Sequence, residues 1–150
     1  APDAGDFLAA ATAFVNENVW GNLSCSVVID SVQQKKLAQP FDAAIAALRY
    51  GNIGVNAWTG ASFTMMYSSF GAFPGNALED IQSGRGAVHN TMLFDHPQKA
   101  VLRLPFRPTP LPPWIAGHRG FGDLAIALTR FEGAPSLLKI PGIARAAFNY

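Results

Sequence analysis

The chain has 150 residues, enough for one domain with a sizeable core, and its net charge is +1. This charge excludes the strongly basic surface that nucleic acids and anionic membranes require, so we expect neither as a partner. The single cysteine excludes an intrachain disulfide and fits a reducing compartment. The sequence has no apolar run of membrane-spanning length and opens with no basic-then-apolar leader, so we expect a cytoplasmic protein.

Charged side chains are scarce in this sequence. They make up 14% of the residues, against roughly 25% in ordinary soluble domains. A small domain that stands alone needs more polar surface than this. The shortage therefore favours a surface that faces other protein, either further parts of the same polypeptide or other subunits. An ordinary domain rich in alanine, glycine and proline is the alternative.

The first expected elements are a helix and a strand. Asp6 is a candidate helix cap and Gly21 a candidate helix end. Residues 25–30 are short, apolar and β-branched, which predicts a buried strand. The apolar residues of the helix recur at helical spacing and are Phe7, Ala11, Phe14 and Val15.

A polar connector is expected over residues 31–39. Pro40 fits the first turn of a second helix, which carries an apolar stripe and ends at Gly51. Residues 53–58 form the next predicted strand. Strand, helix and strand in this order predict an α/β fold, built on a βαβ unit with parallel strands, a right-handed crossover and helices packed on the sheet.

The segment 59–86 is rich in glycine, serine, methionine and phenylalanine and shows no clear period. Connections of this length in compact domains are usually functional or disordered, and the aromatic content argues against disorder. Its apolar side chains form either core or the wall of an apolar pocket, and periodicity does not separate the two interpretations. The apolar residues concerned are Trp58, Phe63, Met65, Met66, Tyr67, Phe70 and Phe73.

The last part of the chain contains one more predicted strand, at 100–104. Prolines dominate residues 105–114, which should be extended and near polyproline II. Such a segment could bind a groove of the SH3 type, but a stiff arm lying on a protein surface is the simpler interpretation. Two helices are expected after it, over residues 121–131 and 141–148.

Cys25 is the only thiol available as a nucleophile. A reactive thiolate needs a helix N-terminus or a cationic neighbour, whereas Cys25 leads into an apolar strand, which indicates a core residue. Together with His89 or His96 it could form a cysteine hydrolase or a metal site. Because no ligand spacing typical of a metal site recurs, we expect no metal, and residues 95–97 are more simply a turn. Residues 84–86 lack the spacing of a phosphate-binding loop and predict another turn.

Four segments, taken in order, resemble the closing section of the aldehyde dehydrogenase family. Val19–Ser26 is similar to the family's Tyr-Gly-Leu-(Ala/Ser)-Ala segment. Ala47–Asn56 is similar to its Ala-Leu-x-(Ala/Tyr)-Gly-x-(Val/Ile)-x-Val-Asn. Ser69–Ala72 resembles the family's Pro-Phe-Gly-Gly, and Gln82–Gly86 the Gln-Ser-Gly-x-Gly-Arg that follows. The resemblance covers residues 6–104.

The resemblance implies a division into the C-terminal portion of a catalytic domain, 1–104, and a Pro-rich arm with a helical extension, 105–150. In that portion Asn56 would end the strand beneath the substrate tunnel, and the loop from Trp58 to Phe70 would line the tunnel mouth. The strand 100–104 would add to the sheet of a neighbouring subunit and so form a homo-oligomer. The implied substrate-pocket residues are Asn56, Trp58, Phe63, Met66 and Phe70.

The resemblance also implies what this chain lacks. In the family, the dinucleotide-binding sheet, the general-base glutamate, the catalytic cysteine and the glutamate that holds the nicotinamide ribose all precede this region. We therefore expect no catalytic or cofactor-binding residue here, and expect NAD or NADP and the aldehyde substrate to be bound by the complete enzyme. The sequence thus predicts the C-terminal part of an NAD(P)-dependent oxidoreductase, inactive alone. A stand-alone, non-catalytic ligand-binding or assembly module of the same architecture is the alternative.

Overall fold

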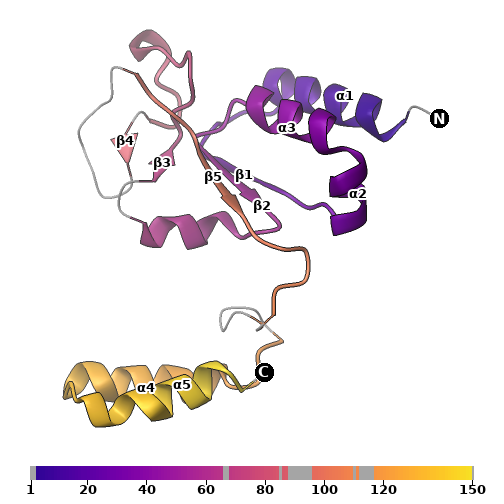
Figure 1. The fold of residues 1–150 in the computed structure, drawn as a ribbon. Helices are drawn as coiled ribbons and strands as arrows, with labels where there is room; N and C mark the ends of the chain where they lie inside the picture. The colour runs from indigo at the N-terminus through magenta and orange to yellow at the C-terminus, as the bar shows by residue number, and fades with distance from the viewer. Residues whose placement is uncertain are drawn as a thin grey trace. The chain divides into compact units, whose positions relative to one another are not determined.

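The computed structural model describes residues 3–65, 68–84, 86–87, 96–109, 111 and 117–149. Its helices and strands are drawn in Figure 1. The chain divides into two compact units, Ala1–Phe106 and Arg107–Tyr150.

The first unit contains a three-stranded parallel sheet in the order β1-β2-β5 (Figure 1). Strand β1 is Ser24–Val27, β2 is Asn52–Val55 and β5 is Ala100–Arg103. The first residues of the three strands lie opposite one another, so the strands share one register. The mixed α/β class and the parallel pairing expected from the sequence are confirmed. Strand β5 pairs with β2 of its own chain, and its expected addition to a neighbouring subunit stays a prediction.

Three helices belong to the same unit: α1, Ala4–Asn18; α2, Ser31–Lys36; and α3, Ala38–Ala47. Helices α1 and α3 lie side by side on one side of the sheet (Figure 1). Parallel strands need such a cover, and the apolar stripes of the helices provide it. The buried residues of this core are Phe41, Ile45, Leu48, Tyr50, Ile53 and Val55.

Two aspartates begin helices for the same physical reason. Asp3 Oδ1 accepts from the N–H of Asp6 at 2.8 Å, so Asp3 caps α1 and the expected cap at Asp6 is wrong. Asp30 Oδ1 accepts from the N–H groups of Val32 and Gln33 and begins α2, where we expected only a polar connector. In both cases the carboxylate satisfies N–H groups that the first helical turn leaves open.

Lys99 closes the far end of α3. Its Nζ donates to the carbonyl oxygens of Ile45 and Leu48 at 2.9 Å, and also to that of Ala46. An ammonium at a helix C-terminus satisfies carbonyls without intrahelical partners and complements the helix dipole. Partial burial lowers the pKa of Lys99, and the neighbouring Cys25 acts in the opposite direction. Because Lys99 directly precedes β5, this capping ties the start of β5 to α3.

Short elements fill the connection between β2 and β5. They are η1, Thr59–Thr64; β3, Ser69–Phe70; η2, Leu78–Asp80; and β4, Gly86–Ala87. Strands β3 and β4 pair antiparallel. Elements this short leave no period in a sequence, which explains why none was found over residues 59–86.

The second unit contains two helices, α4, Phe121–Gly133, and α5, Ile140–Ala147, joined through η3, Leu137–Lys139. Helices α4 and α5 pack against each other. Gly120 permits a close approach here, because a Cβ at this position would lie 2.3 Å from the carbonyl oxygen of Ala146. Both helices agree with the sequence prediction to within a few residues.

Residues 110 and 112–114 of the proline-rich segment lie outside the described residues. The expected extended course of 105–114 therefore stays a prediction. Within the part of the chain that the structure describes, no helix combines the length and apolar character needed to cross a membrane.

Gly51 has a different role from the expected helix stop. Helix α3 already ends at Ala47. A Cβ at Gly51 would lie 2.1 Å from the backbone nitrogen of Gly71 and 2.7 Å from that of Ala72. Gly71 itself has a φ of +89°, which favours glycine. Gly51 is thus needed because the turn after β3 lies directly against the start of β2.

The substitution Gly51→Ala should lower the free energy of unfolding by about 2 kcal/mol or more, because backbone rather than a flexible side chain must move to admit the methyl group. Gly122→Ala is the matched control, since nothing lies within 4 Å of a Cβ there and the site is helical. It should leave stability unchanged or raise it. Urea unfolding measures both variants, and equal stabilities would contradict the close approach.

Candidate functional site

Asn56 joins the carboxyl ends of β1 and β2. Its N–H donates to the carbonyl oxygen of Val27 at 2.8 Å, and its side-chain Oδ1 accepts from the N–H of Ile29 at 2.8 Å. Its φ is +52°, a left-handed conformation that asparagine tolerates better than most residues. Asn56 therefore turns the chain at the edge of the sheet where ligands of open α/β folds usually bind.

The amide nitrogen of Asn56 is the remaining polar atom of this turn. Its Nδ2 is buried and has no hydrogen-bond partner among the described residues. A buried donor without a partner costs free energy.

Trp58 presents an exposed aromatic surface next to this turn. Its side chain is 65% exposed. A Cβ at Gly60 would lie 2.3 Å from Cζ2 of the indole, so the ring lies flat over that glycine. Because Gly60 has no side chain, the indole can lie against its backbone, although Trp58 is not buried in the core.

Phe63 and Phe70 are brought together although they belong to different elements, η1 and β3. Their ring centroids are 6.3 Å apart, with the ring planes 77° apart, an edge-to-face pair. Phe63 is 51% exposed and Phe70 is half-buried. Met66, the remaining expected pocket residue, lies outside the described residues. We use the name aromatic wall for the Trp58 ring together with the Phe63–Phe70 pair, which all lie in the segment that follows β2.

Two polar contacts near the aromatic wall were not anticipated from the sequence. Ser24 Oγ and Thr59 Oγ1 lie 3.2 Å apart, and Ser26 Oγ donates to the carbonyl oxygen of Ala57 at 3.3 Å. Ser24 and Ser26 are two apart in a strand, so they point to the same face of the sheet. This spacing of two residues is the feature of the sequence from which the shared face could have been predicted. The two hydrogen bonds connect η1 and the turn before it to β1.

Cys25 is placed as a structural thiol rather than a nucleophile. It is half-buried in β1 and packs against the core. Burial raises the pKa of its thiol from 9.0 to about 11, and the opposing effect of Lys99 is smaller. A thiol with such a pKa is almost entirely protonated near neutral pH.

The histidines give no support to a hydrolase or metal site in the described part of the chain. His89 and Asp95 lie outside it, and His96 is exposed. His118 belongs to the second unit, where its Nε2 lies 2.9 Å from the carbonyl oxygen of Ala147. Among the described residues, no three His, Cys, Asp or Glu side chains are placed to hold a metal ion.

One glycine pattern invites comparison with a dinucleotide site. Gly120, Gly122 and Ala125 have the Gly-x-Gly-x-x-Ala spacing at the start of α4. However, Gly120 serves the contact with α5, and Asp123 places a negative charge in the first helical turn. No strand occurs in the described residues between β5 and α4. These residues therefore do not fit a nicotinamide dinucleotide.

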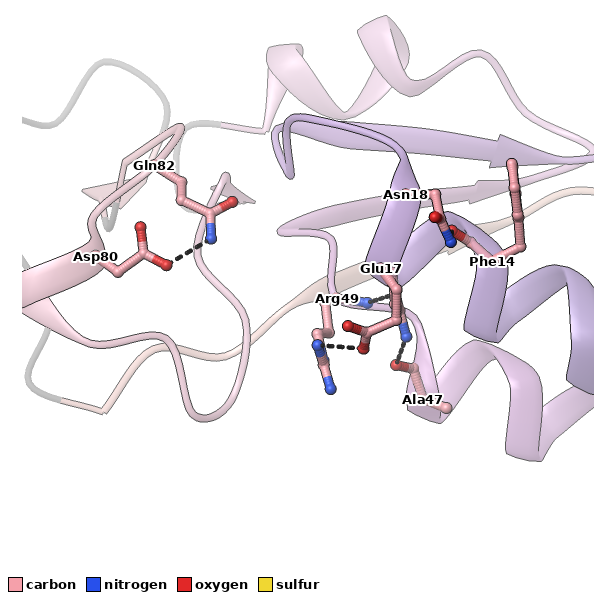
Figure 2. A network of polar contacts seen from close by, with 8 residues as sticks. Phe14, Glu17, Asn18, Ala47, Arg49, Asp80 and Gln82 are labelled. Atoms are coloured by element: carbon pink, nitrogen blue, oxygen red, sulfur yellow. Dashed lines mark hydrogen bonds and ion pairs between the residues drawn. The ribbon is translucent and has the colours of Figure 1, made fainter.

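A polar cavity of about 390 Å³ lies between α1, the residues that follow α3 and the loop containing residues 73–82. Arg49, which lines the cavity, forms an ion pair of 2.9 Å with Glu17 of α1, and Gln82 donates to Asp80 at 2.9 Å (Figure 2). Each charged group drawn in Figure 2 thus has a partner within the chain. Exposed pairs of this kind contribute little to stability.

No protein-family model, curated protein or solved structure matches the chain. The likeness to aldehyde dehydrogenases therefore depends on the ordered sequence motifs alone.

The link made by Asn56 can be measured by comparing two substitutions. Asn56→Gly removes the bond to Ile29 but accepts the positive φ, so it should cost about 1 kcal/mol of unfolding free energy. Asn56→Ala loses the same bond and adds the strain of a left-handed alanine, so it should cost about 1–2 kcal/mol more. Urea unfolding compares them, and equal losses would contradict the conformational cost.

The raised pKa of Cys25 predicts slow alkylation. At pH 8 the folded chain should react with iodoacetamide about a hundredfold more slowly than the urea-unfolded chain, because two pKa units separate the thiolate fractions. The unfolded chain also loses this proton first. Native stability should therefore fall as pH rises from 9 toward 11, and Cys25→Ala should reduce that fall. Equal alkylation rates would contradict the burial of the thiol.

Proposed function

We propose that this chain is the C-terminal part of the catalytic domain of an NAD(P)-dependent aldehyde dehydrogenase-like oxidoreductase. In this role it supplies one wall of the substrate pocket and an oligomer interface, and it does not oxidise aldehydes alone. The observation that carries the proposal is the free edge of β1.

Strand β1 has the character of an interior strand. Among the described strands it pairs only with β2. Trp20, which precedes the strand in the chain, is 97% exposed, and Val28, which follows it, is 73% exposed. Leu23 is exposed as well. Natural edges are protected by lysine, proline, bulges or inward charges, yet residues 19–29 contain none of the charged residues or prolines that would do this. A parallel sheet continuing beyond β1, within a larger catalytic domain, accounts for this edge.

The aromatic wall is a second feature that supports the same proposal. It follows the carboxyl end of β2, where ligands of parallel α/β sheets bind. Contiguous exposed apolar patches mark ligand or partner sites. In the complete enzyme, Trp58, Phe63 and Phe70 would face the aldehyde, with Asn56 at the turn beside them.

The chemistry of the reaction must come from elsewhere in the enzyme. Attack on an aldehyde needs a thiolate, and the buried thiol of Cys25 is a poor source of one. The bound nicotinamide cofactor supplies the hydride acceptor, and the glycine pattern at the start of α4 does not fit it. This chain therefore shapes the space in which the reaction occurs.

Strand β5 is proposed to carry the contact between subunits. It lies at one end of the strand order, and Val101 on it is partly exposed. Arg103 on the same strand pairs with Asp42 at 2.9 Å and lies over the ring of Phe41, 5.7 Å from its centroid. These contacts hold β5 in the sheet while its outer edge can receive a strand from a second copy.

The purified chain, incubated with NAD or NADP and a panel of aldehydes, should produce no NADH or NADPH. The full encoded protein, with any residues that precede Ala1, should produce it under the same conditions. Reduction of the dinucleotide by residues 1–150 alone would contradict the proposal that this chain does not oxidise aldehydes by itself. A reading frame that starts immediately before Ala1 would favour the stand-alone binding module instead.

A further inference from the structure

The polar cavity lies at the amino ends of β1 and β2. Asn22 comes shortly before β1 and Tyr50 shortly before β2, and both line this space of about 390 Å³. Because the two strands are parallel, their amino ends meet at one edge of the sheet, whereas the turn at Asn56 follows their carboxyl ends. The polar cavity is therefore separate from the proposed substrate pocket.

Asn22 is fixed in the cavity wall by three hydrogen bonds. Its Oδ1 accepts from the N–H of Ser83 at 3.0 Å, and its own N–H donates to Ser83 Oγ at 3.2 Å. Its carbonyl oxygen accepts from the N–H of Gly51 at 2.9 Å. The side chain is only 3% exposed, and its Nδ2 has no hydrogen-bond partner among the described residues. A buried donor of this kind costs free energy that an acceptor atom of a ligand would recover.

Arg49 supplies a cation to the same cavity. Its backbone N–H donates to Asn16 Oδ1 at 2.9 Å, so the base of the side chain is held against α1. Its Nη1 donates to Glu17 Oε1 at 2.9 Å (Figure 2). A guanidinium carries five N–H donors, and this ion pair is exposed and opens at little cost. Arg49 therefore keeps donors with which it can bind a carboxylate.

Asp80 supplies an anion from a different element, η2. Its Oδ2 accepts from Nε2 of Gln82, and its carbonyl oxygen accepts from Nδ2 of the buried Asn76, both at 2.9 Å. Figure 2 shows Asp80 and Gln82 apart from the ion pair made by Arg49. Of the residues that line the cavity, Arg49 and Asp80 are the charged ones. The cavity thus offers one group of each sign at separate positions.

A ligand that matches this lining carries both charges. Its carboxylate binds the guanidinium and amide N–H donors, and its ammonium binds the carboxylate of Asp80. An acid without an ammonium would bring a second anion next to Asp80, and an amine without a carboxylate would give Arg49 and Asn22 no acceptor. Phe73 and Pro74 also line the cavity and provide apolar contact for a hydrocarbon side chain.

We propose that the polar cavity binds a free α-amino acid with an apolar side chain. The carboxylate binds Arg49 and the amide nitrogen of Asn22, and the ammonium binds Asp80. The amide nitrogen has almost no exposed surface, so this contact needs a small shift of the cavity lining. Much of that lining belongs to an exposed loop, with Pro74, Gly75, Asp80 and Gln82. The inference does not depend on the proposed function, because it concerns the other edge of the sheet.

Isothermal titration calorimetry on the 150-residue chain compares L-leucine with two matched compounds. These are 4-methylpentanoate, which lacks the ammonium, and 3-methylbutylamine, which lacks the carboxylate. Leucine should bind at least about tenfold more tightly than either, because each compound loses a charge-assisted interaction. No binding of leucine at about 10 mM, or equal binding of the acid, the amine or uncharged glycerol, would overturn the proposal.

Substitutions of the two charged residues test where leucine binds. Arg49→Gln and Asp80→Asn each remove one charge from an exposed side chain, and each should weaken leucine binding at least about tenfold. Arg103→Gln and Asp42→Asn are the matched controls, because these residues form an exposed ion pair of the same 2.9 Å outside the cavity. They should leave the affinity unchanged, and losses equal to those of Arg49→Gln would overturn the site.

Glu17→Gln distinguishes a ligand-binding Arg49 from a purely structural one. Glu17 competes with the ligand carboxylate for the guanidinium, so its replacement should tighten leucine binding severalfold. Unchanged or weaker binding by this variant would contradict the role of Arg49.

Heteronuclear NMR spectra locate the contact directly. Leucine should shift the side-chain amide signal of Asn22 and the backbone amide signal of Ser83. The side-chain amide signal of Asn149, in the second unit, should stay in place. Saturable shifts that leave Asn22 and Ser83 unaffected would overturn the polar cavity as the site of binding.

Discussion

Strand β2 is the constraint on which the first unit depends. It pairs on both sides with parallel strands, and all four of its residues are buried. Parallel pairing cannot be closed by a tight turn, so each neighbour must arrive through a longer connection. The helices α2 and α3, the close approach at Gly51 and the capping by Lys99 are all parts of those two connections.

The same strand positions the candidate site. The turn at Asn56 follows β2 directly and is held to the end of β1 by two hydrogen bonds. The aromatic wall begins immediately after this turn, so the two hydrogen bonds connect Trp58 and η1 closely to the sheet. Sites built on rigid elements in this way hold a ligand more exactly than sites on free loops.

Local patterns predicted most of the regular elements, because apolar periodicity reports which face of a helix or strand is buried. The helices α1, α3, α4 and α5 and the strands β1, β2 and β5 follow from such patterns. Helix α2 was missed because its formation depends on the cap at Asp30 rather than on an apolar stripe. The edge-to-face pair of Phe63 and Phe70 could not be predicted either, because η1 and β3 are too short to produce a periodic pattern of apolar residues. The role of Gly51 depends on Gly71, far along the chain.

The position of β5 in the sheet has a consequence for how the chain is made. On the ribosome β1, α2, α3 and β2 are synthesised first, and one side of β2 has no partner until residues 56–99 have also emerged. During that interval one edge of β2, whose residues are all buried in the finished fold, and the outer edge of β1 are both open to other nascent chains. Late closure of non-local strand pairs is slow and prone to aggregation. Synthesis in this order therefore leaves one edge of β2 unpaired until β5 has emerged.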